Sequence, residues 1–165
     1  GFGYSNGRAR FTVTTEAVET THQSAFIVRS DATHANEIIF EFSGFGNTCA
    51  ISKTVATTYT YAAVAAAQAF TFAAATTYNF LVEWSGSLFR MKIWDAAGAE
   101  PAAWTISGTN TEVTGAGTSG VQSYSGTTAA TQDAVFDTLQ VMPASCAGVG
   151  SSSEASTSMG APFAS

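Results

Sequence analysis

Runs of β-favouring residues alternate with clusters of turn-forming residues along most of the chain. Their spacing of about 8 to 12 residues is typical of an all-β sandwich or barrel. The alanine-rich piece Ala62–Ala75 also suits one amphipathic helix, but its interleaved Thr, Tyr and Phe favour a strand. We therefore expect strands at Ala9–Val18, Ser24–Arg29, Glu37–Phe42, Thr48–Val55, Tyr59–Ala65, Ala69–Phe72, Tyr78–Trp84, Leu88–Asp95, Trp104–Gly108, Ser119–Tyr124 and Ala134–Val141.

The clearest local pattern predicts a hairpin across Gly86 and Ser87. A two-residue type II′ turn, with Gly86 at the position that needs a positive φ, sets Ser85 opposite Leu88. One face of the two strands is then apolar and the other polar, and a slip by one residue would mix them. The apolar face carries Phe80, Val82, Trp84, Phe89, Met91 and Ile93, and the polar face Leu81, Glu83, Arg90 and Lys92.

Motifs in the second half of the chain resemble a known family. They are the run Arg90-Met-Lys-Ile-Trp-Asp-Ala-Ala-Gly-Ala-Glu-Pro-Ala-Ala-Trp104, the glycine-rich Gly115–Gly120 and the closing Val135-Phe-Asp-Thr-Leu-Gln-Val141. Together they resemble the concanavalin A-like (laminin-G-like) jelly-roll domains of tailed-phage virion proteins and secreted bacterial proteins. The resemblance covers roughly Phe11 to Pro143. It implies an all-β, antiparallel two-sheet jelly-roll sandwich with one concave sheet, and it names no activity by itself.

The composition supports one packed domain followed by a tail. The chain has 165 residues, of which 45% are hydrophobic and 11% charged, and a domain of this length buries enough surface to be stable without a metal. After Pro143 the sequence becomes rich in Gly, Ser and Ala, as flexible segments are. We expect the jelly-roll domain over residues 1–143 and a flexible tail or docking arm over residues 144–165.

The charge pattern disfavours nucleic acid as a partner, and the short apolar runs disfavour a membrane. The net charge is −6, and the six basic residues are scattered singly, which disfavours nucleic acid. The longest apolar run, Tyr61–Ala67, is far shorter than the roughly 20 residues of a membrane helix, so no membrane partner is expected. The chain begins at Gly1 without a methionine or a leader pattern, which predicts a processed chain or a fragment.

Cys49 and Cys146 are the two cysteines of the chain. A bridge between them would enclose most of the sequence and contribute about 4 kcal/mol in the loop-entropy model. The alternative is two small buried hydrophobes or a free pair, and both interpretations are open. With no CxxC and only His22 and His34 available, the chain has no ligand set for zinc.

Glu37 and Glu41 lie four residues apart on one expected strand, so their side chains point to one face. In the resembled fold, glycoside hydrolases of the laminarinase type place Glu-x-Asp-x-Glu on a concave strand, with the first Glu as nucleophile and the last as acid. Here Ile39 stands at the middle position, so the carboxylates lack that electrostatic partner. We expect two solvated strand carboxylates rather than a catalytic pair.

Asp137 shares its alternation with Val135, Leu139 and Val141, which predicts a carboxylate on an apolar strand face, where it needs a partner. Several jelly rolls place an Asp of the last strand on a structural calcium, and Asp133 is the one obvious helper here. Calcium takes six to eight oxygens, and the sequence offers no dense Asp/Asn loop. A hydrogen bond to backbone or hydroxyl groups near the N-terminal strand is therefore favoured, and no other cofactor is expected.

Trp94 falls on the polar side of its strand together with Arg90, and Trp104 follows the turn at Pro101. An exposed ring stacks well on the apolar face of a pyranose. The favoured interpretation is a loop that folds back so that Trp94, Trp104 and Pro101 form a satellite cluster.

These features favour a non-enzymatic virion structural or surface protein, such as a capsid decoration or a tail or fibre component. Its expected place is the virion surface or the extracellular space, and its expected partners are other virion proteins or copies of itself. The alternative is a secreted carbohydrate-binding module that uses Glu37, Glu41, Arg90 and Trp94, and the two roles combine if the virion adheres to host glycans. A glycoside hydrolase or lyase is the least favoured class.

Overall fold

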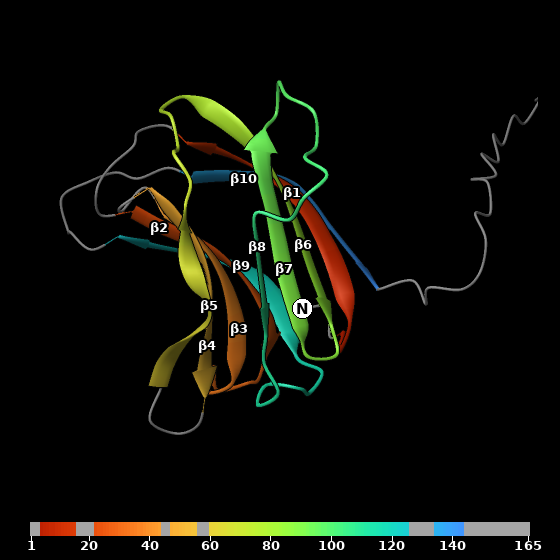
Figure 1. The fold of residues 1–165 in the computed structure, drawn as a ribbon. Coiled ribbons are helices and arrows are strands. Elements are labelled where there is room, and N and C mark those ends of the chain that lie inside the picture. Colours follow the sequence, from red (N-terminus) through yellow and green to blue (C-terminus); the bar gives the residue numbers. More distant parts are fainter. Residues whose placement is uncertain (1–3, 16–21, 44–46, 56–59, 126–133, 144–165) are drawn as a thin grey trace, which may run out of the picture.

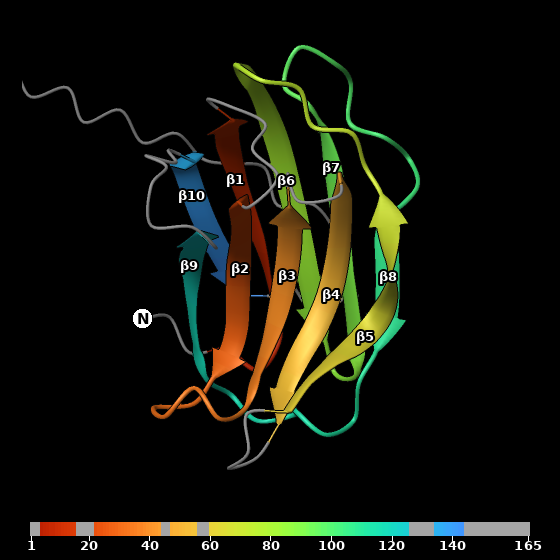
Figure 2. The same ribbon diagram turned by 90° about the vertical axis from the view of Figure 1, so that its left-hand side faces the viewer.

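The computed structural model describes five ranges of the chain, residues 4–15, 22–43, 47–55, 60–125 and 134–143. Within them all elements are strands, arranged as two antiparallel sheets that face each other (Figures 1 and 2). Sheet A contains, in spatial order, β10 (Ala134–Pro143), β1 (Gly7–Thr15), β6 (Thr76–Ser85), β7 (Leu88–Asp95) and β8 (Ile106–Thr109). Sheet B contains β5 (Thr60–Ala69), β4 (Thr48–Val55), β3 (Glu37–Ser43), β2 (His22–Ser30) and β9 (Thr118–Ser125).

This arrangement confirms the prediction of an all-β, antiparallel two-sheet sandwich. The described ranges contain no helix long and apolar enough to span a bilayer. The expected tail over residues 144–165 lies outside these ranges and stays a prediction.

The hairpin predicted across Gly86 is confirmed in every pair. Ser85 lies opposite Leu88 and Trp84 opposite Phe89. Gly86 has a φ of 56°, a left-handed backbone conformation that glycine adopts readily and that strains residues with a side chain. The register therefore follows from a local turn, as the sequence indicates.

The core lies between the sheets and is built largely from aromatic rings. Phe11 stacks on Phe80 with ring centroids 5.0 Å apart and on Phe26 of the opposite sheet at 5.3 Å. Trp84 is fully buried, and its indole nitrogen donates to the Tyr4 carbonyl oxygen at 3.2 Å. Inward positions alternate with outward ones along each strand, so the outer faces of both sheets are left for other roles.

The alanine-rich piece contains no helix, and its first part, up to Ala69, belongs to strand β5. The separate strand expected at Ala69–Phe72 is wrong. The Phe70 backbone N–H donates to the Asn47 carbonyl oxygen at 2.8 Å, and the Phe72 N–H donates to the Asn47 side-chain oxygen at 3.2 Å. One asparagine thus satisfies donors that a neighbouring strand would otherwise satisfy.

The two lateral sides of the sandwich differ. On one side β5 and β8 contact each other, and the approach is so close that a Cβ on Gly108 would lie 2.7 Å from the Val64 carbonyl oxygen. On the other side the edge strands are β9 and β10. The exposed large apolar side chains of the described residues all lie on these two strands: Val121, Val135, Leu139 and Met142.

Candidate functional site

The four side chains suggested as sugar contacts lie on opposite sides of the sandwich. Glu37 and Glu41 alternate with core residues of β3, so they lie on the outer face of sheet B. Arg90 and Trp94 alternate with core residues of β7, so they lie on the outer face of sheet A. The structure places the members of each pair on one face, but the core of the sandwich separates the two pairs.

Both carboxylates of β3 are held by neighbouring side chains. Glu37 accepts a hydrogen bond from the Ser30 hydroxyl at 3.0 Å, and its Oε2 lies 3.2 Å from His34 Nδ1. Glu41 Oε2 accepts from Gln23 Nε2. The two glutamates are only 7% and 5% exposed, so the expectation of solvated carboxylates is wrong: polar neighbours satisfy them instead of bulk water.

A short loop positions His34 beside Glu37. Asp31 Oδ1 accepts from the Thr33 backbone and hydroxyl at 2.9 and 2.8 Å, and Oδ2 accepts from the Asn36 side chain at 2.7 Å. The hydrogen bonds from Asn36 and Thr33 lower the pKa of Asp31 to about 2. The imidazole of His34 is mostly exposed.

An aliphatic cluster lies between the two glutamates. Ala25 and Ile27 of β2 and Ile39 of β3 form a group of buried residues separate from the main core. Ile27 pairs with Ile39 and Ala25 pairs with Glu41. Figure 2 views this face, and no described strand or connection lies in front of β2 and β3. We call the following five residues the β3 patch: Ala25, Ile27, Glu37, Ile39 and Glu41.

Sheet B is curved, and the β3 patch lies on the inside of the curve (Figure 1). The neighbouring strand β4 adds small polar side chains, because Ser52 pairs with Ile39 and Thr54 pairs with Glu37. Both are buried. The face therefore combines carboxylates, hydroxyls and aliphatic surface within a few strands.

The connection between β7 and β8, residues 96–105, folds onto the outer face of sheet A. The Trp104 ring lies 4.3 Å from the Arg90 guanidinium carbon and 5.1 Å from Lys92 Nζ. The Trp94 ring lies 5.5 Å from the Arg10 guanidinium carbon. The loop folds back as expected, but in the described residues these two tryptophans contact cations and form no ring pair with each other.

Two carboxylates on this face are each shared by two cations. Glu83 accepts from Arg8 Nη2 at 2.7 Å and from Arg90 Nε at 3.0 Å. Burial raises the pKa of Glu83, but the hydrogen bonds from the two arginines outweigh it and the pKa is lowered. We call this group, Arg8, Glu83 and Arg90, the Glu83 triad.

The second shared carboxylate belongs to Glu100, in the connection that carries Trp104. It accepts from Lys92 Nζ at 3.0 Å and from Arg10 Nη2 at 2.5 Å. The hydrogen bond from Lys92 is the main cause that lowers the pKa of Glu100. We call Arg10, Glu100 and Lys92 the Glu100 triad.

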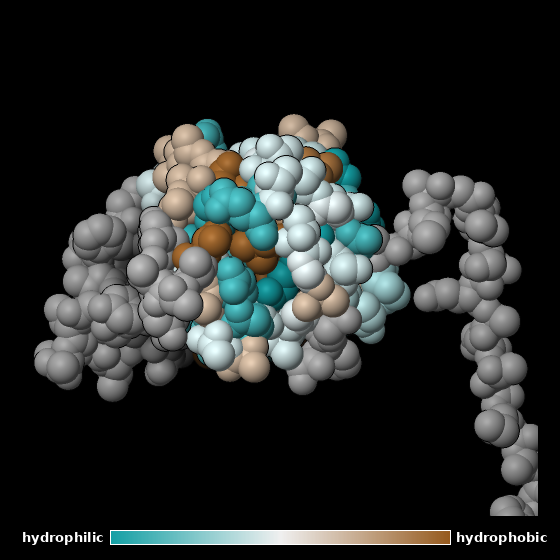
Figure 3. All heavy atoms as spheres, turned by 90° about the horizontal axis from the view of Figure 1, so that it is seen from below, coloured by the Kyte–Doolittle hydropathy of each residue, from teal (hydrophilic) through white to brown (hydrophobic). Residues whose placement is uncertain are grey.

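A buried cation, Arg29, lies at the end of the sandwich that carries the β6–β7 turn. Figure 3 views the molecule from this end. The Arg29 guanidinium donates to the backbone carbonyl oxygens of Ser5 (3.0 Å from Nε), Val113 (2.8 Å) and Gly86 (2.8 Å), and it lies 4.9 Å from the Phe89 ring. Burial lowers the pKa of Arg29. Sequence reasoning missed this site, because a φ of 56° at Arg29 breaks the strand alternation.

Asp137 is exposed and lies opposite Thr12 of β1. Its Oδ1 accepts from the Thr138 backbone N–H at 2.6 Å. The expected common face with Leu139 and Val141 is wrong, because the register shifts next to Thr138, which has a φ of 52°. This partner lies within β10 itself, whereas the sequence pointed to a partner near the N-terminal strand.

The described residues contain no group of three or more His, Cys, Asp or Glu side chains that could hold a metal. Asp133 lies outside these residues, so the calcium site remains a prediction.

Cys49 is buried opposite Phe42 and forms no disulfide with any residue that the structure describes. Burial raises its pKa to about 11, so the thiol stays protonated and packs as a small apolar group. Cys146 lies outside the described residues, and the proposed bridge stays a prediction.

Solved structures of low sequence identity share this architecture. The carbohydrate binding module CBM66 from Bacillus subtilis matches with a TM-score of 0.67 and 15% identity, over 86% of this chain and 78% of that one. Chicken galectin 2 matches with a TM-score of 0.54 and 11% identity, over 82% of this chain and 88% of that one. The fold is a jelly-roll β-sandwich. It agrees with the concanavalin A-like fold expected from the sequence motifs.

A third match is an enzyme. Xylan β-1,4-xylosidase from Bacillus halodurans C-125 matches with a TM-score of 0.61 and 11% identity, over 83% of this chain but 27% of the enzyme. The jelly-roll chain therefore corresponds to one part of that protein. Neither a protein-family model nor a curated protein matches the sequence, and the expected link to phage virions has no support among these structures.

Proposed function

We propose that this jelly-roll domain is a non-enzymatic carbohydrate-binding module and that the β3 patch is its sugar site. The observation that carries the proposal is the pair of carboxylates, Glu37 and Glu41, on either side of an aliphatic cluster on the inside of a curved sheet. A sugar is itself amphipathic, with a C–H face and hydroxyl edges. Sites for such ligands combine apolar contact with a few oriented polar groups.

The polar groups of the β3 patch are held in place before any ligand arrives. Ser30 and His34 orient Glu37, and Gln23 orients Glu41. A fixed acceptor loses little rotamer freedom when it binds a hydroxyl, so less free energy is lost on binding. Similarity to a carbohydrate binding module and to a galectin supports this proposal over the virion role favoured by the sequence motifs alone.

We propose binding rather than hydrolysis because Ile39 stands between the two glutamates. A glycosidase needs one carboxyl as acid and one as base or nucleophile, with environments that separate their pKa values. An aliphatic side chain at the central position supplies contact surface for the sugar but no charge to separate those values.

The test is a glycan array of neutral oligosaccharides that includes xylan fragments, followed by calorimetry on the best ligand. Glu41→Gln keeps the shape and removes the charge, and we expect a loss of about tenfold in affinity. The matched control is Glu112→Gln, which removes an exposed carboxylate paired with Lys53 away from the patch. Absence of any neutral ligand, or an equal loss in both variants, would refute the proposal. Release of reducing sugar that Glu37→Gln abolishes would show an enzyme instead.

A further inference from the structure

The geometry points to a second binding surface, on the outer face of sheet A, for a polysaccharide that carries carboxylate or sulfate groups. It is centred on Arg8 and Arg10 of β1 and is separate from the β3 patch. The polysaccharide class rests on the proposed carbohydrate-binding function, whereas the preference for negative charge follows from this face alone.

The charge distribution is the first argument. Four of the six basic residues of the chain converge on this face although the net charge of the chain is −6. Each triad contains two cations and one carboxylate, so each keeps a formal charge of +1 after its internal ion pairs have formed. Asp137 of β10 lies on the same face and binds the Thr138 N–H. With it, the face carries four cations and three carboxylates, in contrast to the strongly acidic remainder of the chain.

Exposure of the donors is the second argument. The side chains of Arg8 and Arg10 are 50% and 48% exposed, whereas Trp104 covers the cations of Arg90 and Lys92. Arg8 and Arg10 each bind their carboxylate through Nη2, and a guanidinium has five N–H donors in a planar fork. The remaining donors suit the paired oxygens of a carboxylate or sulfate group.

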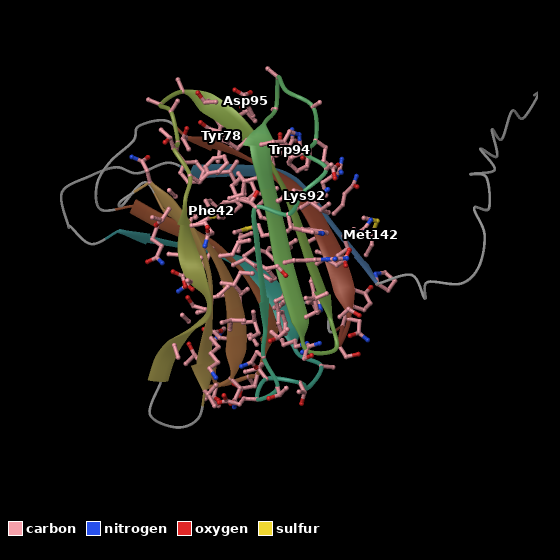
Figure 4. The ribbon with its side chains drawn as sticks, viewed as in Figure 1. Phe42, Tyr78, Lys92, Trp94, Asp95 and Met142 are labelled. Carbon is pink, nitrogen blue, oxygen red and sulfur yellow. The ribbon has the colours of Figure 1, made fainter. Side chains whose placement is uncertain are left out.

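Spacing and neighbours are the third argument. Arg8 and Arg10 are two residues apart on one strand, so they point to one face with Cα atoms about 7 Å apart. On β10, Met142 lies beside Arg8 and Gln140 beside Arg10. Met142 is an exposed apolar side chain, and Figure 4 shows it on the same side of the molecule as Lys92 and Trp94. A charged sugar would therefore meet two guanidinium groups, an amide and an apolar contact together.

The test measures retention of the whole chain on immobilised polygalacturonate, which carries carboxylates, and on dextran sulfate, which carries sulfates. Neutral dextran is the blank. We expect retention on at least one acidic polymer, and the more strongly retaining polymer identifies the preferred group. Raising the salt to about 0.5 M shortens the Debye length to a few ångströms and should release the protein.

Variants test whether retention depends on Arg8 and Arg10 specifically or only on the net charge of the protein. Arg8→Gln and Arg10→Gln should each weaken retention by about tenfold. Lys53→Gln, which removes the same formal charge from a lysine paired with Glu112, should change it by less than about twofold. A far-ultraviolet circular dichroism spectrum confirms that each variant is folded.

Several outcomes would overturn the inference. They are failure to bind either acidic polymer, an equal loss with Lys53→Gln, and equal retention on single-stranded DNA that depends on the same arginines, which would indicate general polyanion binding. The β3 patch is tested separately: Glu41→Gln should leave retention on the acidic polymers unchanged. The two proposals can therefore fail independently.

Discussion

Arg29 packs against the inner side of β7, whereas Arg90 projects from the outer side of the same strand, and each stacks on an aromatic ring. Arg29 lies 4.9 Å from Phe89 inside the sandwich, and Arg90 lies 4.3 Å from Trp104 outside it. The inner guanidinium binds backbone carbonyls, whereas the outer one binds the carboxylate of Glu83.

The two arginines therefore have different roles. Neutral carbonyls satisfy a buried cation without cancelling its charge, so Arg29 joins three chain segments from a position that is closed to solvent. A shared carboxylate leaves its two cations with a net positive charge at the surface. The inner site thus serves stability and the outer face serves recognition.

Replacing Arg29 should produce the largest loss of stability. Arg29→Met keeps the length and apolar stem of the side chain but removes every donor to Ser5, Gly86 and Val113. Lost hydrogen bonds and unsatisfied carbonyls should lower the free energy of unfolding by about 3 kcal/mol. Urea unfolding followed by tryptophan fluorescence measures this change.

Arg29→Lys is the control for that variant. It keeps the charge but not the planar fork. We therefore expect it to be less stable than the wild type but more stable than Arg29→Met. If Arg29→Met lost less than about 1 kcal/mol, the guanidinium would not hold the end of the sandwich together.

Replacing Trp104 should have an intermediate effect. Trp104→Ala removes the ring that contacts Arg90 and Lys92, and two partly exposed cation–π contacts are together worth about 1–2 kcal/mol. Trp104→Phe keeps a ring and should recover most of that stability in urea unfolding. Equal losses for the two variants would mean that the indole acts through some contact other than ring stacking.

Lowering the pH should produce the smallest loss of stability, and the loss should come mainly from the outer face of sheet A. Glu83 and Glu100 have lowered pKa values in the folded state, so their contribution is complete above their usual pKa of 4.5 and is lost as the pH falls through the folded values. The exposed pairs are worth about 0.5 kcal/mol each. Asp31, with a pKa of about 2, contributes a further loss below pH 3.8.

The carbonyl acceptors of Arg29 do not titrate, so the end of the sandwich should not share this response. Urea midpoints measured between pH 7 and pH 3 show how strongly stability depends on pH. Glu100→Gln should make this dependence weaker. An unchanged dependence in that variant would show that other carboxyls cause the acid response.

Local patterns of the sequence predict local structure well in this chain. The turn at Gly86 and the alternation around it depend on residues a few positions apart, and every pair of that hairpin follows from them. The common face of Glu37 and Glu41 is also a local property, since alternation within one strand decides it.

Features that depend on distant residues could not be predicted. Contacts between residues far apart in sequence decide whether β3 and β7 join the same sheet. Local patterns therefore do not show that Glu37 and Arg90 lie on opposite sides of the sandwich. The partners of Arg29 are Ser5, Gly86 and Val113, and its positive φ breaks the alternation that sequence reasoning assumes. At Thr138 a shift of register similarly places Asp137 and Val141 on opposite faces of β10, although strict alternation would put them on one face.

The position of β1 in sheet A affects how the chain assembles. β1 lies between β6 and β10, and Ala9 pairs with Val82 on one side and Val141 on the other. Pairings between such distant residues make folding slow, and during synthesis on the ribosome β1 emerges well before either neighbour. An incomplete chain that ends before β10 would present the open side of β1 to other chains, and unpaired strand edges of this kind promote aggregation.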